Sequence, residues 1–288
     1  MSPRDLASLF LLGAIWGASF LFMRVAAPQF GPIALIEVRL VVATLFLLIV
    51  GARSGRLRGM RAHVRPLVVL GVFNAAVPFA LFAFATLTLP AGFSSVLNAT
   101  TPLFAAVFGL LWLRERIAPR RTLGLALGFA GVLALVWPKL QATDERLAVA
   151  AGLVAALLYA LCVHYGKRAL VNVPPFVTST GSLLAAALAL APFALFSWPA
   201  VPPDARAWGA ALALGIVCTA VAYVIYFRLI TRVDPMHATV VTYLVPVFGI
   251  AWGALFLGES VTLAMLGGAG VVIAGVVLVT RPAARASR

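Results

Sequence analysis

Apolar residues dominate the chain from end to end, and only short polar or proline- and glycine-rich segments interrupt them. A helix that crosses a bilayer needs roughly 20 consecutive apolar residues. Runs of about that length recur along the sequence and predict an all-α integral membrane protein with ten transmembrane helices. The predicted spans are 6–23, 32–50, 66–88, 91–113, 121–137, 148–168, 176–196, 208–230, 235–257 and 264–280.

The composition fits a chain whose solvent is largely lipid. Of the 288 residues, 63% are hydrophobic and 10% are charged, and the mean hydropathy is +1.08. A soluble domain carries about 25% charged residues and has no use for so much apolar surface. Ten spans occupy most of the length, so we expect no separate soluble domain.

The basic residues are distributed unevenly along the chain, whose formal net charge is +14. With the N-terminus inside, 17 of the 22 Lys and Arg residues fall in inside segments and 4 fall outside, while Arg39 lies within a span. Basic loops remain in the cytoplasm. We therefore expect a bacterial-type inner membrane protein with both termini cytoplasmic, and the charge indicates topology rather than nucleic-acid binding.

The sequence repeats itself at an offset of about 144 residues, which divides it into halves at 1–140 and 141–288. Pro102 corresponds to Pro246 and Glu115 to Glu259, and a one-residue slip near the start of each half relates Trp16 to Tyr159. Each half holds five spans, an odd number, so the second half must be inverted relative to the first. Inverted repeats are typical of secondary transporters, which hold substrate near the membrane midplane between the repeats.

Several residues stand out together: Trp16-Gly17, Arg24, Arg39, and the pairs Pro102 with Glu115 and Pro246 with Glu259. This doubled arrangement resembles the drug/metabolite transporter superfamily, in its ten-helix EamA-type branch. The resemblance covers nearly the whole chain, and within the branch the sequence is similar to the YddG-type aromatic amino-acid exporters. It implies export across the inner membrane without a cofactor.

The two repeated prolines indicate where polar groups could face a cavity. Each lies about 16 Å into its span at 1.5 Å per residue, and a proline leaves the carbonyl four residues earlier without its amide partner. Those carbonyls belong to Asn98 and Thr242. We expect Asn98, Thr101, Thr242 and Tyr243 to bind substrate; the alternative is a kinked helix whose polar side chains bond to neighbouring helices.

A second group of candidates is aromatic. Trp16 and Tyr159 lie deep in their spans, and four more rings occupy corresponding positions of spans 3 and 8: Phe79, Phe82, Tyr223 and Tyr226. An aromatic pocket suits flat or apolar substrate side chains. For any single one of these rings core packing is the commoner role, and the argument for a pocket rests on the set.

Charges inside a membrane are costly and therefore usually functional. Glu37 and Arg39 lie in span 2, on nearly opposite helix faces, and we expect a structural or gating role for both. Glu115 and Glu259 lie at span ends, where we expect them to pair with arginines. The other buried positions predict a neutral, mostly apolar cavity that suits amphipathic zwitterions such as hydrophobic amino acids.

Other functions fit the sequence less well. An intramembrane enzyme would need a motif such as His-Glu-x-x-His or paired aspartates, and neither occurs; we also expect no metal site. A channel would need a continuous polar path. A lipid or drug flippase stays open as an alternative. Besides its substrate, the expected partner is the lipid bilayer, with the chain a monomer or a homodimer; the Gly124-x₃-Gly128 and Gly249-x₃-Gly253 motifs allow close packing within or between subunits.

Overall fold

The computed structural model describes residues 2–111, 119–230, 232–233 and 240–280, and every regular element in these ranges is a helix. The elements are α1 Pro3–Phe30, α2 Pro32–Arg53, η1 Met60–His63, α3 Val64–Gly71, η2 Val72–Ala76, α4 Val77–Thr88, α5 Ala91–Asn98, α6 Thr101–Leu111, α7 Pro119–Val136, η3 Trp137–Leu140, α8 Thr143–Ala169, α9 Pro175–Phe196, α10 Ala205–Gly215, η4 Ile216–Val221, α11 Ala222–Ile230, α13 Val240–Leu257 and α14 Leu263–Thr280.

These elements combine into ten helices that are long and apolar enough to cross a membrane, which confirms the predicted number of spans. The third span joins η1, α3, η2 and α4, the fourth joins α5 and α6, and the eighth joins α10, η4 and α11. Predicted residues 112–113 and 235–239 lie outside the described ranges.

The first span is longer than the predicted 6–23. It begins at Pro3, where the Ser2 and Asp5 side chains form a capping box, and continues to Phe30 before Gly31 ends it at φ 72°. Capping satisfies the amides of the first turn, and Arg24 is accommodated inside the helix because its side chain finds acceptors in the protein. An apolarity pattern detects neither effect.

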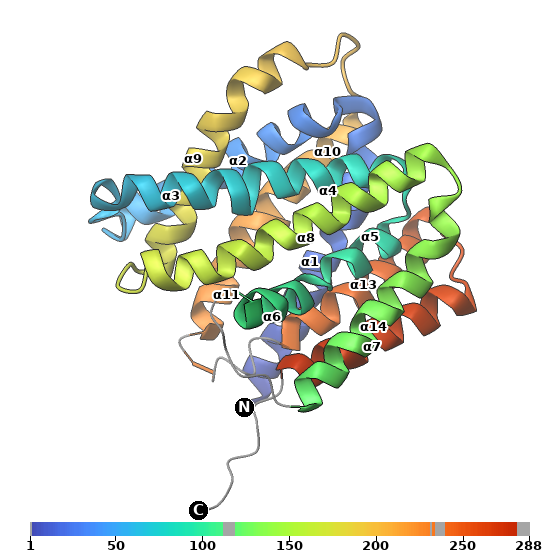
Figure 1. Ribbon diagram of the computed structural model, residues 1–288. Helices are drawn as coiled ribbons and strands as arrows, with labels where there is room; N and C mark the ends of the chain where they lie inside the picture. Colours follow the sequence, from blue (N-terminus) through green and yellow to red (C-terminus); the bar gives the residue numbers. More distant parts are fainter. Residues whose placement is uncertain (1, 112–118, 231, 234–239, 281–288) are drawn as a thin grey trace, which may run out of the picture.

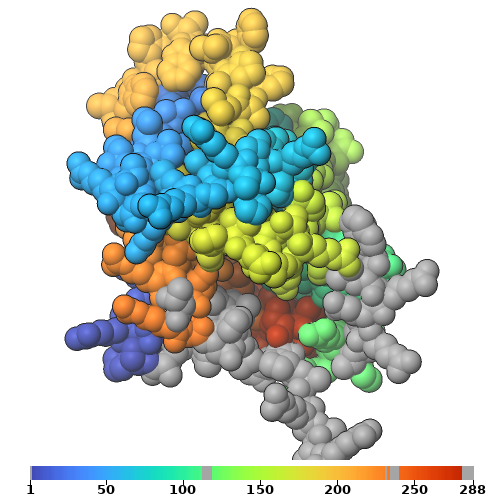
Figure 2. All heavy atoms as spheres, turned by 90° about the vertical axis from the view of Figure 1, so that its left-hand side faces the viewer, coloured from blue at the N-terminus to red at the C-terminus, as the bar shows by residue number. Residues whose placement is uncertain are grey.

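The helices interleave the two halves of the chain (Figure 1). Extensive contacts join α7 with α14, α1 with α13, α4 with α8 and α2 with α9, and each of these pairs combines one helix from each half. The ten spans form two inverted five-helix repeats that share a main core, and a smaller apolar cluster surrounds Leu67 and Leu70. Figure 2 shows α3, α8 and α11 along one side of this bundle.

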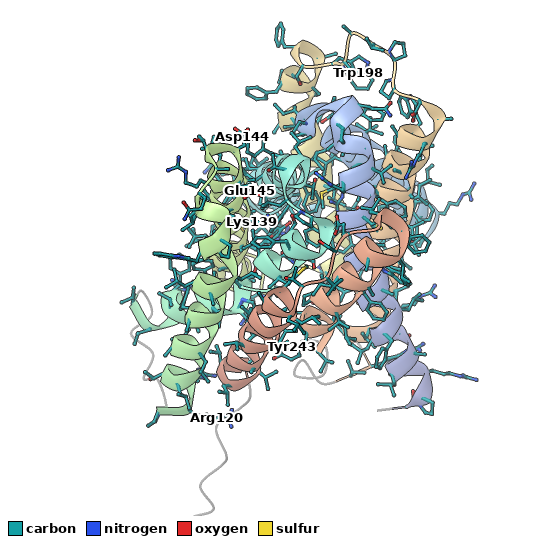
Figure 3. The ribbon with its side chains drawn as sticks, turned by 90° about the vertical axis from the view of Figure 1, so that its right-hand side faces the viewer. Arg120, Lys139, Asp144, Glu145, Trp198 and Tyr243 are labelled. Carbon is teal, nitrogen blue, oxygen red and sulfur yellow. The ribbon has the colours of Figure 1, made fainter. Side chains whose placement is uncertain are left out.

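We call the side on which α1 begins and α14 ends the near side, and the opposite side the far side. Figure 3 shows Lys139, Asp144 and Glu145 gathered at the far-side connection between α7 and α8, whereas Arg120 lies at the near-side end of α7. Lys139 Nζ forms an ion pair with Glu145 Oε1 at 2.7 Å.

Glycines allow α7 and α14 to pack closely. A Cβ atom placed on Gly275 would lie 2.5 Å from the Cα atom of Gly128, and one on Gly124 would lie 2.8 Å from the carbonyl oxygen of Gly275. The Gly124-x₃-Gly128 motif therefore serves contacts inside the molecule. This internal role accounts for the motif without a second subunit.

The third and eighth spans share a feature that the sequence did not predict. Each contains a short π-helical segment, η2 at Val72–Ala76 and η4 at Ile216–Val221, and the two begin 144 residues apart. π-helical turns frequently occur at functional sites because they redirect the side chains around them. Both segments contribute to the cavity described next.

Candidate substrate cavity

A cavity of about 620 Å³ lies between the two halves of the bundle. This volume is in the range of sites for small molecules, which is about 300–1,000 Å³. Met23 and Arg39 line the cavity toward the far side, and it extends to the near side, where Arg121, Lys167 and Thr280 lie at the ends of α7, α8 and α14. The two halves therefore contribute to one wall.

Most residues that the sequence nominated for substrate binding line this cavity. They are Trp16, Phe79, Phe82, Asn98, Thr101, Tyr159, Tyr223 and Thr242. Tyr226 and Tyr243 are not in the wall. Tyr226 packs against Trp16 with ring centroids 5.5 Å apart, and the Tyr243 hydroxyl forms a hydrogen bond with Thr280 Oγ1.

The aromatic residues form a continuous surface on one part of the wall. The Phe82 and Tyr159 rings are stacked with centroids 6.1 Å apart, and Phe79 meets Tyr159 edge to face at 6.5 Å. Phe20 contacts Phe82 edge to face at 5.4 Å. Each ring is held by another ring, so the wall presents fixed apolar faces to a bound molecule.

The fourth span is broken where Pro102 was expected to perturb it. α5 ends at Asn98 and α6 starts at Thr101. The Asn98 carbonyl is not left open to the cavity, however, because the Thr101 hydroxyl donates to it at 2.8 Å. In the second half α13 continues through Pro246. The Asn98 side-chain amide lines the cavity and makes no hydrogen bond within the described part of the chain.

Arg39 shows that the expectation of a neutral cavity was wrong. Its side chain is only 5% exposed and lines the cavity. Arg39 Nε donates to Thr219 Oγ1 at 2.9 Å, and the guanidinium carbon lies 3.7 Å from the centroid of the Phe79 ring. No aspartate or glutamate is among the described residues of the wall. A cation with no acidic counterpart therefore faces this space.

Glu37 takes a different position. It is half-buried, it is not part of the cavity wall, and its Oε2 atom has no hydrogen-bond partner among the described residues. It forms no ion pair with Arg39 in these ranges. The two charges of α2 therefore face different surroundings, as their spacing of two residues implies.

The far side of the bundle is held together around the turn between α4 and α5. Arg24 Nη1 donates to the carbonyl oxygens of Thr86 and Leu87, each at 2.6 Å. Glu259 accepts from the Ala91 amide at 2.7 Å. The expectation that Glu259 pairs with an arginine was wrong: its carboxylate caps the N-terminus of α5, where the amides lack helical partners. Glu115 lies outside the described residues.

Several wall residues were not nominated from the sequence. Asn74 and Cys218 lie 144 residues apart in the two π-helical segments, Thr219 follows Cys218, and Ser19 and Met23 lie on α1. The repeat offset could have found the first pair, since it relates the one amide of span 3 to a small side chain of span 8. Cys162 and Cys218 are both free and buried.

Comparisons with known proteins agree with this architecture. A family model described as "EamA-like transporter family" matches residues 6–137 and again 146–281. A "Probable amino-acid metabolite efflux pump" of Salmonella typhimurium is 25% identical over 96% of this chain and 94% of its own length. A "Probable terminal-alkyne amino-acid exporter" of Streptantibioticus cattleyicolor is 27% identical over 95% and 92%.

Two further comparisons extend these matches. An "Uncharacterized transporter" of Archaeoglobus fulgidus is 26% identical over 95% of this chain and 97% of its own length. A solved crystal structure superposes with a TM-score of 0.66 at 18% identity, covering 97% of this chain and 98% of the other. At that identity the superposition supports the fold alone.

Proposed function

This chain belongs to the EamA-like transporter family, and we propose that it exports small amphipathic metabolites, in particular aromatic and hydrophobic amino acids. It is a multi-pass membrane transporter rather than an enzyme. In the proposed orientation the near side is the cytoplasm of a bacterial-type cell, so both ends of the chain lie in the cytoplasm and the cavity is open to its contents.

The observation that carries the proposal is an aromatic cavity between inverted repeats that also contains polar groups. Flat apolar side chains gain from stacking on fixed rings. The Asn98 amide and the hydroxyls of Thr101 and Thr242 line the same space and can replace water around the backbone of an amino acid. A cavity of about 620 Å³ accommodates a molecule the size of tryptophan.

The proposed mechanism is alternating access. In the present conformation the cavity extends to the near side, while Arg24 and Glu259 hold the far-side turn between α4 and α5. Export requires these far-side contacts to release while the near side closes. Bound substrate lowers the barrier because it makes contacts that the emptied cavity would otherwise lose.

Uptake into liposomes tests the proposal directly. The purified protein is reconstituted, and uptake of labelled phenylalanine, tryptophan and threonine is followed with and without a pH gradient. Saturable uptake without a gradient supports a facilitative exporter, whereas uptake that needs the gradient points to proton coupling. No uptake into tight, correctly loaded liposomes would contradict the amino-acid proposal and favour a lipid or drug substrate.

Two variants connect such uptake to the cavity. Asn98→Ala and Thr242→Ala each remove a polar group from the wall, and we expect each to raise the KM of uptake several-fold. Thr143→Ala is a matched control, because Thr143 begins α8 at the far-side surface and does not line the cavity. If Thr143→Ala weakens uptake as strongly, the effect of the Asn98 and Thr242 variants is not specific to the cavity.

A further inference from the structure

Arg39 lies at the deep end of the cavity. It is the eighth residue of α2, which puts it about 10 Å from the far-side start of that helix at 1.5 Å per residue. α2 approaches α10 closely at this turn, since a Cβ atom on Gly215 would lie 3.1 Å from the Arg39 carbonyl oxygen. The close approach brings the η4 segment and Thr219 to the guanidinium.

The contacts of Arg39 fix its orientation but leave most of its donors unused. Nε is bound to Thr219, whose own hydroxyl donates to the Leu214 carbonyl at 2.9 Å. The Phe79 ring covers one face of the guanidinium. The two Nη groups make no hydrogen bond or ion pair within the described part of the chain. Four N–H donors therefore remain for a ligand.

A buried cation without an anion is costly, because it has lost its hydration without a compensating charge. The described wall contains no acid and carries two more basic side chains, Arg121 and Lys167, toward the near side. The potential in the cavity is therefore positive. The Nη groups of an arginine match the two oxygens of a carboxylate, which can accept two parallel hydrogen bonds.

Arg39 has no charged counterpart in the second repeat, unlike the aromatic wall. At the offset of 144 residues Phe79 corresponds to Tyr223, so the aromatic wall is preserved in both halves. Arg39 corresponds to Leu183, or to Ser182 with the one-residue slip, and neither carries charge. A requirement of the five-helix unit itself would be expected twice. A requirement of the bound molecule needs to be met only once.

We propose that Arg39 binds the carboxylate of the transported amino acid, with its Nη groups donating to the two oxygens. This inference rests on the proposed function and narrows the substrate class to molecules that combine a carboxylate with an apolar group. The carboxylate then lies beside Phe79, and the substrate side chain extends along Phe82 and Tyr159. The Asn98 amide remains available to the ammonium group.

Three labelled ligands test the proposal by equilibrium binding to the purified full-length protein in detergent. Phenylalanine carries both charges, 3-phenylpropionate lacks the ammonium group, and phenethylamine lacks the carboxylate. We expect the wild type to bind the two carboxylates at least about tenfold more tightly than phenethylamine, since a charge-assisted hydrogen bond contributes a factor of about ten or more. Equal affinity for phenethylamine would overturn the role of Arg39 and leave the proposed transport function intact.

Variants separate carboxylate recognition from structural support. Arg39→Gln should weaken binding of phenylalanine and 3-phenylpropionate at least about tenfold, and it should not weaken binding of phenethylamine, whose ammonium group the Arg39 charge repels. Arg39→Lys keeps the charge without the planar fork, so its affinity for the two carboxylates should lie between that of the wild type and that of Arg39→Gln. Lys167→Gln is the control for the general positive potential and should affect the two carboxylates by less than Arg39→Gln does.

Two outcomes would count against the proposal in different ways. If Arg39→Gln and Arg39→Lys weaken all three ligands equally, Arg39 supports the fold of the site and does not recognise the carboxylate. If the wild type binds none of the three and transports no amino acid, the proposed function fails and this inference fails with it.

Discussion

Glu259, in the connection between α13 and α14, accepts a hydrogen bond from the backbone amide of Ala91 at 2.7 Å. The contact joins the end of the ninth span to the start of the fourth, across 168 residues of sequence. A second oxygen accepts from the Gly92 amide at 3.3 Å. Gly253 leaves the space for this carboxylate, because a side chain there would occupy its position.

Glu259→Gln should weaken the contact with the start of α5 and make the cavity open to the far side more often. The variant keeps the size of the side chain but loses the charge, which contributes about 1–2 kcal/mol at a helix N-terminus. A change of that size shifts a two-state equilibrium about 5- to 30-fold. We expect a cysteine at Met23, in a variant without Cys162 and Cys218, to react several-fold faster with a membrane-impermeant thiol reagent added from the far side.

Glu145→Gln provides the control for that measurement. Glu145 also lies on the far side and also makes a polar contact, its ion pair with Lys139, but this pair spans the α7–α8 connection, is partly exposed and does not touch α5. Its loss should leave the labelling rate at Met23→Cys unchanged. Equal acceleration in both variants would show that far-side charge, rather than the contact with α5, controls access.

Arg24→Gln should lower the thermal stability of the protein and favour opening in the same direction. The Arg24 guanidinium binds two carbonyls at the C-terminal end of α4, which have no helical partners. Removing it should cost about 1–3 kcal/mol, measured as a lower Tm in detergent. Because Arg24 and Glu259 hold the same turn, the double variant should lose less than the sum of the two; strict additivity would indicate two independent contacts.

The sequence predicted the number of spans and most of the aromatic wall, each from a different pattern. Apolar runs of sufficient length identify spanning helices whatever their packing. In an inverted repeat, corresponding positions face the same axis, so the correspondence of Phe79 with Tyr223 indicated a shared surface. Asn98 was found in the same way, through its relation to Pro102.

The remaining features depend on contacts that residue patterns do not contain. The partner of Glu259 is a backbone amide, which has no signature in the side-chain sequence. Arg39 lies on a helix that is apolar on nearly all sides, so its periodicity does not define which face meets the cavity. Tyr226 was nominated from the correspondence of spans 3 and 8, and Tyr243 from its place beside Thr242 near Pro246. Helix rotation directs them to Trp16 and Thr280 instead.

Gly275→Ala should destabilise the protein by forcing α7 and α14 apart. The added methyl would lie 2.5 Å from backbone atoms of Gly128, which cannot move aside as a flexible side chain could. Overpacking of this kind typically costs about 1–3 kcal/mol. Gly270→Ala, on the same helix, has nothing within 4 Å of the added carbon and is the matched control. A lower Tm for Gly275→Ala alone is expected; equal Tm values would mean that the helices separate without cost.

Asp204 should make stability depend on pH at the far side. Its carboxylate accepts from the Ala207 amide at 2.7 Å and from the Gln29 side chain at 2.9 Å, and these hydrogen bonds, the Ala207 amide first, lower the pKa of Asp204. A lowered pKa in the folded state stabilises the protein above the unfolded value of about 3.9, and this stabilisation is lost as the pH falls through the folded value.

The wild type should therefore have a higher Tm than Asp204→Asn at pH 6, and the difference should disappear as the pH falls below about 4. Gln29→Leu removes one donor, so it should lessen the lowering of the pKa and move the loss of stability to higher pH. A difference in Tm that stays constant across this range would mean that the Asp204 charge does not contribute to folding.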